Sequence, residues 1–216
     1  MHVAGEPETL DRDEPLARKV QRHDYDRLLM LSDGVFAIAI TLLVLDVRPP
    51  AAWNGDLPGL IRSIWRALFG YGFGFAAVGG FWIAHRTLFA RLRRIDGPAT
   101  ALALALLLFV GLVPAAAALV SEHGPTKGIP AYLLLVAVIA GVQASLWIYA
   151  AFVGDLVDAA VSRRERKIRA MLLLVPFLIF GFLFGVGASN FAGWALVPIL
   201  LAVAAARALR GRLPAQ

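Results

Sequence analysis

Cysteine is absent from this chain of 216 residues. Disulfide bonds, thiolate metal sites and a cysteine nucleophile are therefore excluded. Charged residues are scarce, at 17%, whereas hydrophobic residues make up 59% of the chain and the mean hydropathy is +0.72. Because a soluble globular domain contains roughly 45–50% apolar residues, this composition predicts an integral membrane protein.

Ionisable side chains are also absent from the centres of the long apolar segments. Such a group at mid-membrane is costly and usually marks a proton relay or an ion-coupling site. The polar side chains found near the centres of these segments are Thr41, Gln143 and Ser145. A metal centre would need more ligands than the sequence places around His85, and we expect no cofactor.

The chain is basic, with a formal net charge of +6 and a pI near 10.3. Its Lys and Arg residues flank apolar segments rather than gather on a polar surface, so we do not expect nucleic acid as a partner. Residues 1–27 lack the apolar core of a cleavable signal peptide. Their interleaved acidic and basic residues favour a cytoplasmic N-terminal arm that is partly disordered.

A helix needs about 20 residues to cross about 30 Å of hydrocarbon, and six segments of this chain are long and apolar enough. Breaks that contain Gly, Pro or charged residues separate the first five segments, and Ser189 and Asn190 separate the last two. Residues 28–209 are therefore predicted to form a transmembrane domain, and residues 210–216 a short cytoplasmic tail. The predicted spans are residues 28–47, 60–89, 99–120, 129–153, 170–188 and 191–209.

Lys and Arg are distributed unevenly between the two sides of these spans. Seventeen of the 21 lie in the N-terminal arm, in or beside the breaks after the second and fourth spans, and in the tail. The positive-inside rule then places both termini in the cytoplasm. We therefore expect an all-α integral membrane protein with six transmembrane helices. The four residues on the other side are Arg48, Arg62, Arg66 and Lys127.

The first span has one narrow stripe that differs from the rest of its surface. On a helix of about 100° per residue, Gly34, Ile38, Thr41 and Leu45 form this stripe, with Leu42 on its flank. The stripe suits close packing, since small residues allow helices to approach each other in membranes. It also suits a conduction path, in which apolar side chains resist wetting and the Thr hydroxyl offers oxygen to an ion. The helical wheel alone leaves both interpretations open.

Ser32 and Asp33 point away from this stripe, near the cytoplasmic end of the first span, where a carboxylate among helices needs a partner. In the second span, Trp82 and His85 are three residues apart and share one helix face. A lone histidine at a helix end is usually structural. The functional alternative is a polar anchor that ties the first two spans together through these four side chains.

The first span, from Arg27 through the stretch LSDGVFAIAITLLVLD, closely resembles the first-helix signature of a known family. This is the endosomal and lysosomal potassium channel family, transmembrane protein 175, in its prokaryotic branch. The signature reads Arg, three residues, then Phe-Ser-Asp, and here Leu31 replaces the Phe. The stretches FWIAHR and LLLFVGLVP extend the resemblance more weakly into the second and third spans. After about residue 120 the chain matches the family only in length and hydropathy.

The resemblance implies a homotetramer of six-helix subunits in a prokaryotic cell membrane, with the first helix of each subunit lining a central pore. It also implies cation conduction that favours K⁺ without a carbonyl-lined filter loop, and this chain indeed contains no TVGYG-like sequence. The expected partners are K⁺, membrane lipid and other copies of the chain. In the family, apolar side chains of the first helix form the constriction beside a Thr layer. These positions correspond here to Ile38, Leu42 and Leu45, and to Thr41.

The resemblance also suggests a role for the polar residues at the start of the pore helix. They would lock the rotation of the first helix against the second, while Gly34 permits close approach of the helices. A few degrees of rotation would then move Ile38 into or out of the lumen. The residues of this predicted lock are Arg27, Ser32, Asp33, Trp82 and His85.

Three other functions are alternatives to a passive channel. A secondary transporter, the main alternative, would require broken helices or ionisable groups near mid-membrane. A membrane enzyme would require a nucleophile with a base, or a metal cluster, so we do not expect an enzyme. A non-conducting scaffold could use the small-residue spacings of GYGFG at residues 70–74 and GFLFG at residues 181–185, which are common in Gly-rich spans.

Overall fold

The computed structural model describes residues 16–51 and 53–188, and nearly all of them are helical or lie in short connections. No named β-strand occurs among these residues, only a single antiparallel bridge between Leu92 and Val157. A 3₁₀ helix over Leu43–Asp46 continues the first helix, and a π-helical turn over Tyr149–Val153 continues the fifth. The helices are α1 (Leu16–Leu42), α2 (Leu57–Phe89), α3 (Gly97–Gly111), α4 (Val113–His123), α5 (Pro125–Ile148) and α6 (Arg163–Ala188).

Five stretches of the described chain are long and apolar enough to cross a membrane. The third of them combines α3 and α4, which are interrupted at Leu112. The interruption has a local cause, because Pro114 lacks an amide hydrogen and fits best in the first turn of a new helix. The sixth predicted span, residues 191–209, lies outside the described residues.

The helix boundaries differ from the predicted spans mainly at the N-terminus. The helix α1 begins at Leu16, whereas the predicted first span starts at residue 28. Hydropathy identifies only the apolar part of a helix, so it does not detect the polar extension of α1 before residue 28. The helix α2 begins at Leu57 and ends at Phe89, close to the predicted residues 60–89. Its first turn is capped by the Asp56 carboxylate, which accepts a hydrogen bond from the Gly59 amide at 3.0 Å.

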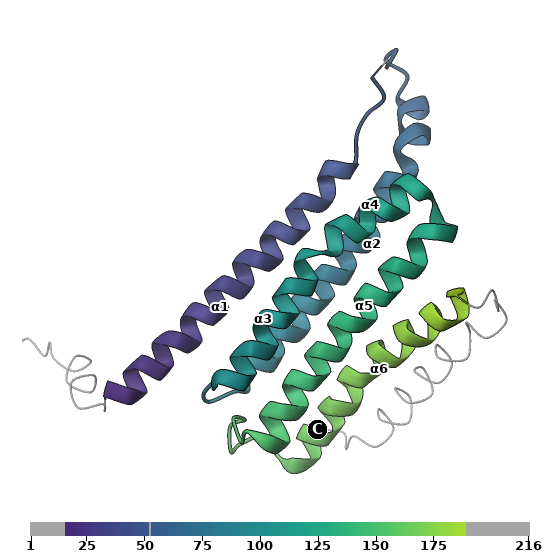
Figure 1. Cartoon of the computed structure of the whole chain (residues 1–216). Coiled ribbons are helices and arrows are strands. Elements are labelled where there is room, and N and C mark those ends of the chain that lie inside the picture. Colours follow the sequence, from purple (N-terminus) through teal and green to yellow (C-terminus); the bar gives the residue numbers. More distant parts are fainter. Residues whose placement is uncertain (1–15, 52, 189–216) are drawn as a thin grey trace, which may run out of the picture.

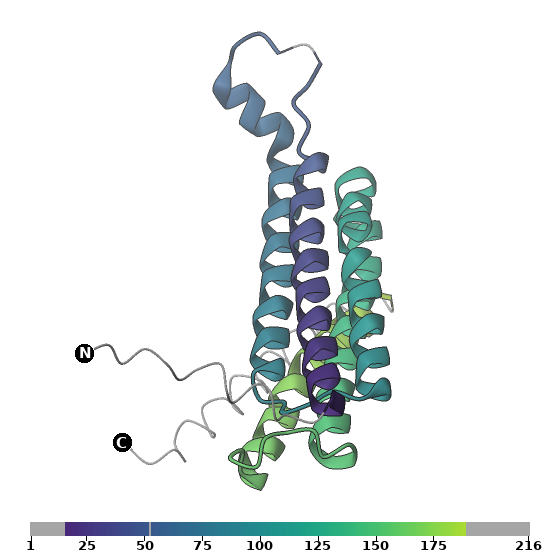
Figure 2. The same cartoon turned by 90° about the vertical axis from the view of Figure 1, so that its left-hand side faces the viewer.

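The five spans run alternately up and down, and α4 continues α3 in the same direction (Figure 1). The helix α1 packs against α2 and α3, whereas α5 contacts α3, α4 and α6. Figure 2 shows α1 and α2 side by side along most of their length. The helix α6 packs chiefly on α5, and large side chains such as Met171 and Leu178 remain exposed on it. The buried core therefore lies among α1 to α5, with α6 at its edge.

One end of the bundle gathers the beginning of α1 and the connections α2–α3 and α5–α6 (Figure 1). Arg93 forms a 2.9 Å ion pair with Asp155, and Arg91 forms a 3.2 Å pair with Glu165. Arg166 donates hydrogen bonds to backbone carbonyls of the α5–α6 connection and the end of α5. These contacts join the second and fourth breaks, which carry the basic residues that the charge count assigns to the cytoplasm.

Candidate functional site

The helix α1 has a buried face and an exposed face within the subunit. Phe36 and Leu43 are each 1% exposed, and Ala39 lies between them on the same buried face. Ile38 and Leu45, in contrast, are each 59% exposed. The buried face packs against α2 and α3. The other face has no partner among the described residues of its own subunit.

The predicted pore stripe lies on this exposed face. Leu42 and Thr41 are exposed beside Ile38 and Leu45. The Thr41 hydroxyl donates a 2.9 Å hydrogen bond to the Ile38 carbonyl of its own helix. Because a hydroxyl oxygen has two acceptor lone pairs, it can still accept a hydrogen bond or coordinate a cation. The four predicted positions therefore form one continuous surface of apolar side chains with a single hydroxyl.

The 3₁₀ turn after Leu42 changes the geometry of this surface. In a 3₁₀ helix the side chains at positions i and i+3 eclipse, so Leu45 lies almost directly in line with Leu42. A regular α-helix would instead turn Leu45 away by about 60°. The four residues from Ile38 to Leu42 rise about 6 Å at 1.5 Å each, and the three residues to Leu45 rise about 6 Å at 2.0 Å each. The exposed face thus carries three apolar layers at regular spacing.

One part of the predicted polar lock joins α1 to α2 directly. The indole nitrogen of Trp82 donates a hydrogen bond to Oδ1 of Asp33 at 2.8 Å. The guanidinium of Arg86 lies 5.5 Å from the centre of the Trp82 ring, on the same helix. Such an arrangement is a cation–π contact. Arg86 is not among the predicted lock residues, although its spacing of four residues from Trp82 places the two on one helix face.

His85 is buried among aromatic rings and does not hydrogen-bond to Asp33 or Trp82. Its ring centre lies 5.6 Å from that of Phe36 and 4.4 Å from that of Phe89. Neither ring nitrogen has a hydrogen-bond partner in the described chain. His85 therefore packs against the buried face of α1 as an aromatic side chain, next to the Asp33 and Trp82 pair.

The side chains of Ser32 and Arg27 form no hydrogen bond or ion pair with Asp33 or Trp82 in the described structure. The buried Ser32 hydroxyl donates to the Leu28 carbonyl of its own helix at 2.8 Å. Arg27 is exposed, and no ion pair joins it to another described residue. Of the five predicted lock residues, the hydrogen bonds join only Asp33 and Trp82 across the two helices. A network through all five stays a prediction.

The close approach of α1 to α2 occurs at Gly74 and not at Gly34. A Cβ atom added at Gly74 would come within 2.8 Å of a Leu43 methyl group. A Cβ atom added at Gly34 would meet nothing within 4 Å. Gly34 lies on the exposed face, so it does not bring the helices of one subunit together. The helices approach closely at Gly74 of the second span, which belongs to the small-residue pattern GYGFG.

Comparison with known proteins places this site in a family. A potassium channel of Streptomyces collinus is 32% identical to the chain over 155 residues, which cover 68% of this chain and 75% of that protein. The family model of the endosomal/lysosomal potassium channel TMEM175 matches residues 27–114. The chain belongs to the TMEM175 family. The matched region runs from Arg27 to Pro114 and includes the exposed stripe of Ile38, Thr41, Leu42 and Leu45.

Other relatives agree with this TMEM175 assignment. A potassium channel of Chamaesiphon minutus is 32% identical over 152 residues, which cover 67% of this chain and 75% of that protein. The crystal structure of a lysosomal potassium-selective channel TMEM175 homolog from the same organism matches with a TM-score of 0.59 and 28% identity, over 83% of this chain and 98% of that one. The endosomal/lysosomal proton channel TMEM175 of Bos taurus is 35% identical over 117 residues, 50% of this chain and 23% of that protein.

The family and the structure confirm the coarse sequence predictions. The chain is an all-helical, multi-pass membrane protein of a channel family. Because that family is one of ion channels, the prediction that the chain is not an enzyme is also confirmed. The resemblance found in the first span is confirmed by the family match, which begins at Arg27 itself.

Proposed function

We propose that the chain is a potassium-favouring cation channel that conducts passively through an apolar constriction formed by α1. The observation that carries this proposal is the exposed stripe of Ile38, Thr41, Leu42 and Leu45 on a helix whose opposite face is buried. The choice of ion is supported by the bacterial relatives, which are named potassium channels, and by the Chamaesiphon crystal structure, which is that of a potassium-selective channel.

The constriction consists of one α1 helix from each of four identical subunits around a central axis. Four copies of Ile38 set the narrowest point, and Leu42 and Leu45 extend the apolar stretch in layers about 6 Å apart. Thr41 supplies oxygen next to the Ile38 layer. A ring without strong ligands favours the ion that loses its hydration shell at lower cost, which is K⁺ rather than Na⁺. The expected selectivity is therefore weaker than that of a carbonyl-lined filter.

The subunit crosses the membrane six times, with residues 28–209 as the channel domain. Residues 1–27 and 210–216 lie in the cytoplasm. Support comes from the end of the bundle at which the α2–α3 and α5–α6 connections gather basic residues, as the positive-inside rule requires of a cytoplasmic end. The proposed location is the cell membrane of a prokaryote, where lipid and other copies of the chain are its partners.

The polar lock holds the pore helix at a fixed rotation. The hydrogen bond between Trp82 and Asp33 ties α1 to α2 about one and a half turns before Ile38. His85 packs against Phe36 from the same face of α2. Ser32 and Arg27 complete the lock on the α1 side. Because Asp33 and Ile38 lie on one rigid helix, a change at the lock turns the constriction by the same angle.

The experiment that tests this function is a planar-bilayer recording of the purified protein with KCl on one side and NaCl on the other. We expect a reversal potential displaced towards the K⁺ equilibrium value, and no current in protein-free bilayers. A second recording uses equal KCl on both sides and a pH gradient, because the Bos taurus relative is named a proton channel. A reversal potential that follows the proton gradient would contradict the preference for K⁺.

The same preparation distinguishes the channel from a secondary transporter. A channel passes ions down their own gradient without a second substrate, so tracer K⁺ flux into liposomes should follow the K⁺ gradient alone. Uptake that saturates and requires the gradient of another ion would indicate the transporter and overturn the proposed mechanism.

A further inference from the structure

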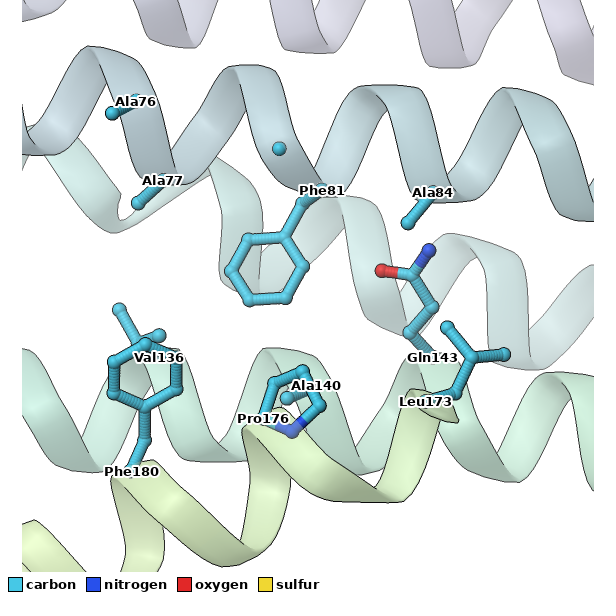
Figure 3. A pocket seen from close by; sticks show the side chains of 11 residues that line it. Ala76, Ala77, Phe81, Ala84, Val136, Ala140, Gln143, Leu173, Pro176 and Phe180 are labelled. Carbon is cyan, nitrogen blue, oxygen red and sulfur yellow. The ribbon is translucent and has the colours of Figure 1, made fainter. Parts of the chain in front are cut away.

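A cavity of about 290 Å³ lies between α2, α5 and α6, away from the exposed face of α1. Figure 3 shows side chains from all three helices around it. Gly80 and Phe81 of α2 line one side, and Pro176 and Phe180 of α6 line another. Apart from Gln143, every lining side chain is apolar. The volume approaches that of sites for small organic molecules, which begin at about 300 Å³.

Gln143 is the polar member of this lining, and it is 1% exposed. Its amide points from α5 into the cavity, towards Phe81 and Ala84 of α2 (Figure 3). Neither Oε1 nor Nε2 has a hydrogen-bond partner in the described chain. Gln143 also lies within the apolar span Thr126–Val153. The cavity therefore contains one unpaired donor group and one unpaired acceptor in an otherwise apolar wall.

An unpaired amide in such surroundings is unfavourable, because neither protein nor lipid replaces the hydrogen bonds that water would make. A single water molecule does not solve the problem, since a stable buried water needs two to four polar partners. The side chains of this wall supply no polar group other than the Gln143 amide. The amide is best satisfied by the polar end of a molecule whose remaining part is apolar.

We propose that this cavity is a binding site for a small neutral amphiphile with a hydroxyl group, such as a medium-chain alcohol. Its hydrocarbon part fills the space between Phe81 and Phe180, and its hydroxyl pairs with Gln143. A hydroxyl both donates and accepts, which matches both unpaired atoms of the amide. A charged head group does not fit, since no lining side chain carries a compensating charge.

The packing of α6 gives this ligand a route of entry from the bilayer. The helix α6 packs mainly on α5, and the cavity separates it from α2. A molecule dissolved in the hydrocarbon layer therefore enters sideways, between α2 and α6. This inference does not depend on which face of α1 lines the pore, so binding is measured separately from conduction.

The test uses photolabelling of the full chain in lipid vesicles with a diazirine analogue of 1-octanol, followed by peptide mass spectrometry. We expect labelled residues on α2 and α6 around Phe81 and Phe180. Excess 1-octanol should suppress this labelling at least tenfold more effectively than octane at the same mole fraction in the membrane. Labelling that is confined to other surfaces, or that octanol does not suppress, overturns the proposal.

Two variants test separately the contributions of the Gln143 amide and of the apolar space to binding. Gln143→Leu removes the hydrogen-bonding group at similar volume, and it should weaken competition by octanol about tenfold while leaving that of octane unchanged. Gly80→Leu fills the cavity and should abolish the labelling, and its first carbon is tolerated because a Cβ there meets nothing within 4 Å. If Gln143→Leu leaves octanol competition unchanged, or Gly80→Leu leaves labelling intact, the site is not the one proposed. A channel that conducts normally without such labelling overturns this inference alone.

Discussion

The two faces of α1 consist of similar apolar residues but have different surroundings. Phe36 and Leu43 are enclosed by α2 and α3, whereas Ile38 and Leu45 have no partner among the described residues of the subunit. In a soluble protein, the exposed face would be unfavourable and would by itself indicate a binding surface. In a membrane protein, lipid also satisfies apolar side chains, so hydropathy does not distinguish lipid-facing, pore-facing and packed residues.

The residues of α1 that stabilise the fold and those that line the proposed pore therefore lie on opposite faces of the same helix. Substitutions on the buried face should damage folding, because they open space in a packed core. Substitutions on the exposed face should leave the fold intact and change conduction. Matched substitutions on the two faces test this separation.

The largest expected effect is that of Phe36→Ala on the buried face. Removing this ring opens a cavity against His85, and we expect a loss of about 3–5 kcal/mol in the free energy of unfolding. Ile38→Ala on the exposed face should cost less than about 1 kcal/mol. Denaturant titration of both purified variants in micelles measures the two values. Equal losses would show that both faces are packed, which contradicts the separation.

The next effect concerns the proposed bottleneck itself. Ile38→Asn introduces a polar side chain into the apolar ring, so water and ions should pass more easily. We expect about a tenfold increase in single-channel conductance, which corresponds to a barrier lower by about 1.4 kcal/mol. The control is Ile83→Asn on α2, because Ile83 is 60% exposed and thus as accessible as Ile38. Equal changes in conductance in both variants would show that Ile38 does not line the pore.

A smaller effect is expected where the two faces meet, at the hydrogen bond between Trp82 and Asp33. Trp82→Phe keeps an aromatic ring beside Arg86 but removes the donor, and Asp33→Asn removes the charge of the acceptor. A double-mutant cycle of unfolding free energies should give a coupling of about 1 kcal/mol. A coupling indistinguishable from zero would mean that this contact does not fix the rotation of α1.

The smallest effect is expected for Thr41→Ala, which removes the one hydroxyl of the exposed stripe. Its hydrogen bond is to its own helix, so stability should hardly change. We expect the K⁺ to Na⁺ permeability ratio from reversal potentials to change by less than about threefold, or about 0.6 kcal/mol. Thr87→Ala is the control, since that hydroxyl also donates to a carbonyl of its own helix, one turn earlier. A similar shift in both variants would place Thr41 outside the pore.

Most of the helical layout could be predicted from local properties of the chain. The apolar length of residues 60–89 gave the end of α2. The interruption at Leu112 was missed, since residues 99–120 were predicted as one span. The extension of α1 back to Leu16 was missed, because its polar residues carry no hydropathy signal. The 3₁₀ turn after Leu42 was also missed, since no residue in it is a recognisable helix breaker.

The candidate site could be predicted only in part. The spacing of Ile38, Thr41 and Leu45 reports a shared face, and the structure finds that face exposed. The sequence also indicated that Asp33 needs a partner from the second span, and Trp82 is that partner. It did not indicate that His85 packs against the Phe36 ring, because that contact depends on how two helices cross.

The amino-acid sequence alone was enough to identify a helical membrane protein, the residues that share a face of each helix, and the channel family of the chain. Those properties depend on hydropathy, helical periodicity and local motifs, which can be read along the chain. Only the tertiary structure decided which face of α1 is buried, that Gly74 receives Leu43, and that Gln143 reaches an apolar cavity without a partner in the described chain. The physical reason is that burial depends on atoms brought together from distant parts of the chain, and no single segment contains that information.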